Sequence, residues 1–128
     1  MRPYADGVVR VACRERLICE SVALRDGEDG VRFTVTRPGG EAPAFAVRFG
    51  GRVYAFLNRC AHVPIELDWV PGRFFDDSRR YLICATHGAM YEPRSGHCVA
   101  GPCRGARLGV VPVVEHDGAV FLMSDDER

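Results

Sequence analysis

Alternating apolar and polar residues along most of the chain predict short β-strands rather than helices. Residues 30–37 alternate in this way and are rich in Val, Phe and Thr, and residues 44–49 and 52–57 form two further apolar segments. Gly50-Gly51, which separates the latter two, is the kind of two-residue connection that closes a β-hairpin. From Leu17 onward no segment has the apolar period of a helix, so we expect an all-β protein.

Two more hairpins are predicted in the second half of the chain. Residues 73–75 and 81–83 flank Asp76-Asp77-Ser78, and residues 108–115 and 119–123 flank Asp117-Gly118. Pro112 has no backbone N–H to donate, so part of its strand is expected at the edge of a sheet. Residues 38–43 contain two prolines and two glycines and are expected to interrupt the strands on either side.

The length and charge of the chain limit the classes of function. A chain of 128 residues fits one domain, and 17 basic residues balance 17 acidic ones, so we expect neither a nucleic acid nor a membrane as partner. The chain has no long apolar run and no apolar N-terminal signal, which predicts a soluble, cytoplasmic protein. We expect an N-terminal extension (1–15), one domain (16–124) and an acidic tail (125–128).

Two short motifs carry most of the chemistry, and each follows a predicted strand. Cys60-Ala61-His62 and Cys84-Ala85-Thr86-His87 together offer two thiolates and two imidazoles. In a Rieske centre, two cysteines hold one iron of a [2Fe-2S] cluster and two histidines hold the other. The sequence therefore predicts such a cluster as cofactor, with a structural zinc site on the same four residues as the alternative.

The other four cysteines are expected to be free thiols that pack as small apolar side chains. No export signal accompanies them, and disulfides are rare in cytosolic proteins. These residues are Cys13, Cys19, Cys98 and Cys103.

From Leu17 to Met123 the chain resembles Rieske-type ferredoxins, the small electron carriers of bacterial oxygenase systems. The strongest match is the segment 84–91, Cys-Ala-Thr-His-Gly-Ala-Met-Tyr. Gly101-Pro102 is similar to the family's proline loop, and Tyr91 falls where the family carries an aromatic residue near a cysteine sulfur. The resemblance implies three stacked antiparallel sheets, with a small cluster-binding subdomain (about 58–103) inserted in a β core.

Several positions depart from the family's high-potential respiratory branch. Ile65 and Thr86 stand where that branch has two disulfide-forming cysteines, and Ala89 stands where it has a serine that stabilises the reduced cluster. We therefore expect a potential in the lower part of the Rieske range, which is roughly −150 to +300 mV. Pro64 replaces a common glycine and has no N–H to offer a sulfide. The aromatic side chains between the motifs are expected to pack in the subdomain core rather than to form an exposed docking patch: Trp69, Phe74 and Phe75.

The resemblance implies a one-electron carrier without catalysis of its own, which passes electrons from a reductase to a terminal oxygenase. Val63, Pro64 and Pro102 would form an apolar rim around His62 and His87. A small subunit of a larger reductase, as in nitrite reductases, and a redox sensor are the alternatives. An oxygenase catalytic chain is not expected, because only His97 and His116 would remain to bind its second iron.

Overall fold

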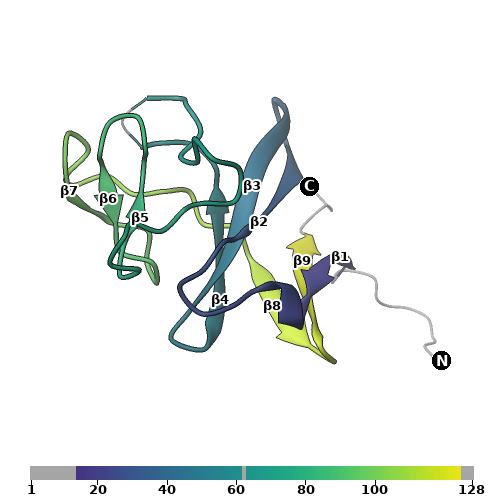
Figure 1. The fold of residues 1–128 in the computed structure, drawn as a ribbon. Coiled ribbons are helices and arrows are strands. Elements are labelled where there is room, and N and C mark those ends of the chain that lie inside the picture. Colours follow the sequence, from purple (N-terminus) through teal and green to yellow (C-terminus); the bar gives the residue numbers. More distant parts are fainter. Residues whose placement is uncertain (1–13, 62, 125–128) are drawn as a thin grey trace.

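The computed structural model describes residues 14–61 and 63–124 and divides them into short strands (Figure 1). The described residues contain nine strands: β1 (Arg14–Glu20), β2 (Val31–Arg37), β3 (Gly40–Phe49), β4 (Arg52–Leu57), β5 (Leu82–Ile83), β6 (Met90–Tyr91), β7 (Cys98–Ala100), β8 (Val113–His116) and β9 (Ala119–Ser124). Ser21–Ala23 forms a single 3₁₀ turn. No helix in this part of the chain is long and apolar enough to cross a membrane.

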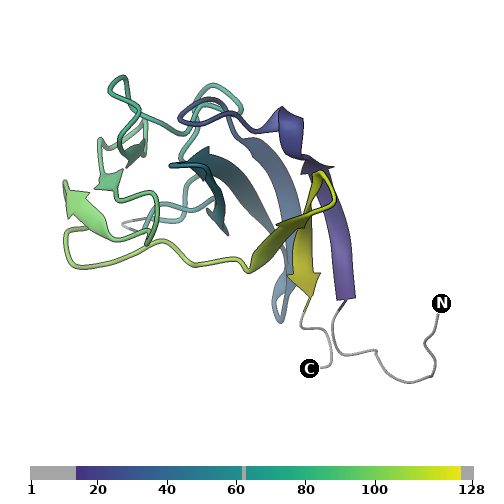
Figure 2. The ribbon, with the colours of Figure 1, turned by 90° about the horizontal axis from the view of Figure 1, so that it is seen from below.

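The strands form three antiparallel sheets of three strands each, in the orders β1-β9-β8, β2-β3-β4 and β5-β6-β7. This arrangement confirms the predicted all-β class. The views in Figures 1 and 2 place the β2-β3-β4 sheet between the other two. The middle sheet therefore has two faces to bury.

The sequence of β3 matches this double burial. Ala44, Phe45, Ala46 and Val47 are all buried, although successive side chains of a strand point to opposite faces. Phe45 and Val47 join the core shared with the β5-β6-β7 sheet, and the two alanines join the core shared with β9. Phe45 stacks on Phe74 with ring centroids 3.9 Å apart, so the middle sheet is packed directly against the segment that leads to β5.

Glycine and aspartate set the two predicted hairpin turns. Gly50 and Gly51 have φ values of +61° and +84°, a left-handed pair that favours glycine and matches the twist of a tight hairpin. Their N–H groups donate to the Asp26 carboxylate at 2.9 and 2.7 Å. Asp117 and Gly118, with φ of +53° and +75°, close the β8-β9 hairpin in the same way.

Three strand predictions need correction. β3 begins at Gly40 and contains Pro43, which is tolerated because β4 ends at Leu57 opposite Ala44 and leaves Pro43 without a partner strand on that side. The hairpin predicted around residues 76–78 forms, but with a single antiparallel bridge, between Phe75 and Leu82, and β5 also pairs with β6. Residues 108–112 precede β8 and contribute one bridge, from Val110 to Phe56.

The chain ends and the aromatic residues also differ in part from expectation. β1 begins at Arg14, so residues 14 and 15 belong to a sheet, while the rest of the predicted extension and the acidic tail lie outside the described residues. Phe74 and Phe75 are buried as predicted. The prediction for Trp69 was wrong, because its side chain is 80% exposed.

Candidate metal centre

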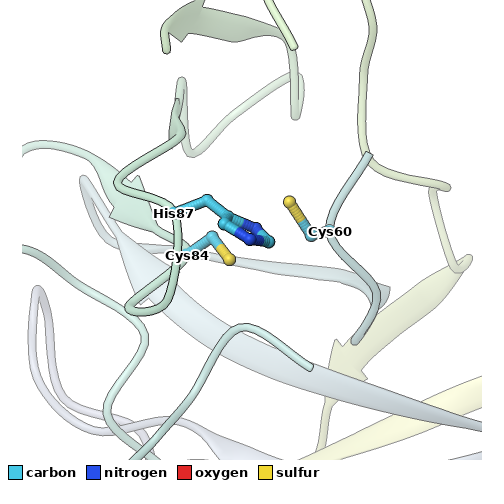
Figure 3. A group of neighbouring side chains, drawn as sticks. All are labelled: Cys60, Cys84 and His87. Carbon is cyan, nitrogen blue, oxygen red and sulfur yellow. The ribbon is translucent and has the colours of Figure 1, made fainter. Parts of the chain in front are cut away.

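Three of the four predicted metal ligands meet in space. Cys60 lies in the loop that follows β4, and Cys84 and His87 lie in the loop between β5 and β6. The two sulfur atoms and an imidazole nitrogen of His87 all lie within 4.8 Å of one another. Figure 3 shows the three side chains converging on one space from two segments of the chain. The fourth predicted ligand, His62, lies outside the described residues.

Short backbone hydrogen bonds fold both loops tightly. The N–H of Cys60 donates to the Ile65 carbonyl at 2.7 Å, and the N–H of Cys84 donates to the Ala89 carbonyl at 2.8 Å. Gly88, with φ of +74°, donates in turn to the Cys84 carbonyl at 2.7 Å. The second loop thus closes on itself around its cysteine, and the left-handed glycine permits the reversal.

A buried polar pair anchors the first loop, and the sequence analysis missed it. Asn58 and Asp68 are 1% and 7% exposed, and the Asn58 amide donates to the Asp68 carboxylate at 2.9 Å. The Asn58 side-chain oxygen accepts the N–H of Leu67 at 2.8 Å, and the Leu67 carbonyl accepts the N–H of Ala85 at 3.0 Å. The network joins the first loop to the second, which holds Cys84 and His87. A lone Asn beside a motif gives no signal of such a role, because its partner lies ten residues away.

The site is buried on the sulfur side and exposed on the imidazole side. Cys60 and Cys84 are 3% and 0% exposed, whereas His87 is exposed. Burial raises the pKa of the Cys84 thiol; the N–H groups of His87 and Thr86 act in the opposite direction, and the neighbouring Cys60 raises this pKa further. The Cys84 thiol therefore resists ionisation beside a second buried sulfur atom, and a bound cation would remove that penalty, so the donor set fits a metal centre.

Tyr91, on β6, extends this sulfur environment. Its hydroxyl oxygen lies 3.2 Å from Cys60 Sγ and accepts the N–H of Ala61 at 3.0 Å. Because Ala61 already donates to this oxygen, the hydroxyl proton is available to a sulfur atom. Tyr91 is fully buried, and burial raises the pKa of its hydroxyl well above the usual range, so the residue stays a neutral hydrogen-bond donor. This position agrees with the one that the resemblance implied.

The prediction that all four remaining cysteines are free was wrong for two of them. Cys98 on β7 and Cys103 form a disulfide across five positions of sequence. Cys103 Sγ lies 3.3 Å from the Tyr91 hydroxyl, so the disulfide fixes the proline loop next to the site. Cys19 is a partly buried thiol, in agreement with the prediction, and Cys13 lies outside the described residues. Spacing alone did not reveal the pair, because the strand and loop geometry decides whether two cysteines can meet.

We expect removal of the disulfide to destabilise the fold moderately. For a closed loop of about six residues, the chain-entropy relation gives a loss of about 2 kcal/mol in the free energy of unfolding. Chemical denaturation of a Cys98→Ser/Cys103→Ser variant against the oxidised wild type would measure it. With dithiothreitol present the wild type should lose the same amount, and the variant should not change. A wild type that is equally stable with and without the reductant would contradict this prediction.

The two remaining histidines are exposed and lie outside the group of three donors. His97 immediately precedes β7. His116 ends β8, where its ring nitrogens lie 2.8 Å from the Glu15 carboxylate and 2.9 Å from the Asp117 carboxylate. These two carboxylates raise the pKa of His116, which belongs to a surface ion pair.

Comparison with protein families finds one match. The Rieske [2Fe-2S] domain model matches residues 15–116, and the matched range includes both cysteine-histidine motifs and the proline loop. Comparison with curated protein sequences finds no match.

Solved structures with the same fold include a ferredoxin and an oxygenase. The ferredoxin of carbazole 1,9a-dioxygenase from Nocardioides aromaticivorans IC177 is 22% identical, with a TM-score of 0.63 over 84% of this chain and 95% of that chain. A chain from a complex of reduced oxygenase and oxidised ferredoxin in carbazole 1,9a-dioxygenase is 23% identical, with a TM-score of 0.64 and coverages of 89% and 96%. The terminal oxygenase from the same Nocardioides strain is 24% identical, with a TM-score of 0.65, and the match covers 89% of this chain but 31% of the oxygenase.

Proposed function

Because the chain belongs to the Rieske [2Fe-2S] domain family, we propose that it is a one-electron carrier of an oxygenase system. The cofactor of this family is a [2Fe-2S] cluster, and when bound it takes up and gives back one electron. The observation that carries the proposal is the convergence of two buried thiols and one exposed imidazole within 4.8 Å.

We propose that Cys60 and Cys84 hold the inner iron and that His62 and His87 hold the outer one. The burial of both sulfur atoms and the exposure of His87 support this division. Thiolates bring negative charge to the buried side, and neutral imidazoles bring none, so fewer charges need to be stabilised inside the protein. The exposed histidine side would then be the point of electron exit.

The proposed partners are a reductase as donor and a terminal oxygenase as acceptor. This assignment is supported by the likeness to the ferredoxin of carbazole 1,9a-dioxygenase, because the match covers 95% of that chain. The match to the terminal oxygenase covers 31% of that chain. We also propose that the carrier works in the cytoplasm, which cell fractionation would test.

Spectroscopy with metal analysis tests the cofactor and its ability to take an electron. Freshly purified protein should be brown, contain iron in a ratio of about two per chain, and give a Rieske-type EPR signal only after reduction by dithionite. A colourless protein that contains zinc and no iron, even after anaerobic reconstitution, would refute the carrier. A stable holoprotein without bound partners would in addition argue against a permanent reductase subunit.

The Tyr91→Phe variant is expected to have a lower midpoint potential than the wild type. The hydroxyl is positioned to donate to Cys60 Sγ, and this bond is stronger when the sulfur carries more negative charge, as it does after reduction. A loss of about 1 kcal/mol in the reduced state corresponds to a shift of roughly 40 mV for one electron. Redox titration of the holoprotein measures the shift.

Tyr54→Phe is the matched control, because Tyr54 lies on β4 and packs against the same core without a hydrogen bond from its hydroxyl to a described residue. Its potential should stay at the wild-type value. Equal potentials for Tyr91→Phe and wild type would show that the Tyr91 hydroxyl does not act on the Cys60 sulfur.

A further inference from the structure

The charge around the candidate metal centre is one-sided, although the whole chain is neutral. The loop with the first motif (58–65), the loop with the second (84–89) and the proline loop (99–109) contain three arginines and no acidic residue. We call the surface formed by Arg59, Arg104 and Arg107 around the site the arginine rim. All three residues are exposed.

No carboxylate neutralises the arginine rim within the described part of the chain. Arg107 and Arg104 each donate to one backbone carbonyl, of Ser95 at 3.1 Å and of Val99 at 3.3 Å. The Arg59 side chain makes no hydrogen bond or ion pair to another described residue. The ion-paired arginines in this part of the chain are different residues: Arg32, Arg48, Arg79 and Arg94.

The acidic residues nearest in sequence are already paired. Glu66, Glu92 and Glu115 each lie within 3.2 Å of an arginine outside the arginine rim. The positive charges of the arginine rim are therefore not balanced locally, and two of them, those of Arg59 and Arg107, lie beside the proposed ligand Cys60.

A groove of about 300 Å³ lies beside Cys60, and two residues of the arginine rim line it. Arg59 and Arg107 line it together with Cys60, Ala61, Val63 and Pro64. Three small or apolar residues and two arginines thus lie beside the proposed ligand. A guanidinium presents paired N–H donors that match a carboxylate, which makes such a groove suited to an acidic side chain.

We propose that the arginine rim is the docking surface of this carrier and that its redox partner is a protein with an acidic surface, one of whose carboxylates enters the groove between Arg59 and Arg107. This proposal rests on the proposed function and names the chemistry of its partner. Charge of this kind guides the association and orientation of the two proteins, and the small apolar area in the groove permits rapid release of the partner. None of the described residues that line the groove is an aromatic platform on which nucleic-acid bases could stack, which favours a protein over a nucleic acid.

The first test compares two small oxidants of opposite charge on the dithionite-reduced holoprotein. Each accepts one electron from the protein: hexacyanoferrate(III), an anion, becomes hexacyanoferrate(II), and the cation hexaamminecobalt(III) becomes cobalt(II). At low ionic strength, we expect Arg59→Gln/Arg107→Gln to slow oxidation by hexacyanoferrate about ten-fold and not to slow oxidation by the cobalt cation. In about 1 M salt, where charges are screened beyond about 3 Å, the variant and the wild type should agree.

Arg25→Gln/Arg52→Gln removes the same two charges from exposed positions away from the loops and is the matched control. It should keep the wild-type rate with hexacyanoferrate. A control that slows as much as the test variant, or wild-type rates independent of salt, would overturn the arginine rim while leaving the electron carrier intact. Failure of dithionite to reduce the protein would instead overturn the proposed function and with it a redox partner.

The second test measures binding without electron transfer. Calorimetric titration of the oxidised holoprotein with a deca-glutamate peptide should detect binding that weakens with salt and is lost in Arg59→Gln/Arg107→Gln but not in the control variant. A deca-lysine peptide should not bind. Equal binding of deca-glutamate to both double variants would contradict the proposal, and tighter binding of a decathymidylate oligonucleotide would overturn the assignment to a protein.

Discussion

The Cys84→Ser variant is expected to purify without its metal centre, with iron reduced from about two per chain to a small fraction of that value. Cys84 is fully buried, and its sulfur lies within 4.8 Å of the other donor atoms described. A serine hydroxyl remains protonated near neutral pH and is a harder, weaker donor to iron than a thiolate. Colour, iron content and the EPR signal after reduction measure the loss.

Cys19→Ser provides the matched control for this substitution. Cys19 is also a thiol without a disulfide, but it is only partly buried, lies on β1 and is outside the group of three donors. The control should keep the iron and the spectrum of the wild type. A Cys84→Ser protein with wild-type iron would refute the proposed ligand set, and circular dichroism of both variants would show whether the β structure is retained.

The largest effect on stability is expected from Arg48, which joins the middle sheet to its neighbours. From β3 its guanidinium donates to both carboxylate oxygens of Glu115 on β8, at 2.7 and 3.1 Å. It also donates to the carbonyls of Leu24, Gly51 and Ser21, at 2.8, 3.1 and 3.3 Å. The side chain is only 16% exposed, so these bonds are partly shielded from water.

Replacing Arg48 with Met is expected to lower the free energy of unfolding by about 2–3 kcal/mol, because it removes the cationic partner of Glu115 and one donor from each of three carbonyls. Chemical denaturation measures the change. Arg79→Met removes an exposed pair with Glu28, whose side chains are 64% and 46% exposed, and should cost less than about 1 kcal/mol. Equal effects at the two positions would mean that Arg48 acts only as a surface charge.

The pH dependence of the free energy of unfolding also reports on the Arg48–Glu115 ion pair. The hydrogen-bonded Arg48 guanidinium lowers the pKa of Glu115 below its ordinary value of 4.5. A carboxylate with a lowered folded-state pKa contributes stability that is fully present above the unfolded value and is lost as the pH falls through the folded one. The stability difference between the wild type and Arg48→Met should therefore narrow below about pH 4.5. A constant difference down to pH 3 would contradict the ion pair.

Local sequence signals predicted the features that depend on neighbouring residues. The hairpin at Gly50-Gly51 and the one at Asp117-Gly118 follow from residues that tolerate positive φ. The strand at residues 52–57 matches β4 as observed. The two motifs predicted Cys60, Cys84 and His87 as ligands because the donor types and spacings are specific, and the structure brings these three side chains together.

Features that depend on distant residues were not predictable in the same way. The pattern around residues 76–78 predicted the hairpin that joins Phe75 to Leu82, but not the pairing of β5 with β6, which lies further along the chain. Trp69 has the side chain of a core residue but lies on a loop that the buried Asp68 carboxylate fixes, through the N–H of Gly72 at 2.9 Å. Its exposure follows from that loop and not from its hydrophobicity.

The sequence by itself determined the all-β class, the hairpin turns and the donor chemistry of the metal centre, because each depends on residues that are close together along the chain. The tertiary structure alone decided the Cys98–Cys103 disulfide, the Asn58–Asp68 anchor and the groove between Arg59 and Arg107. Arg59 and Arg107 lie 48 positions apart in the sequence, and the balanced net charge of the chain does not indicate that they lie at one groove. Only folding brings such groups within reach, because distance in space, and not composition, sets the strength of contacts and fields.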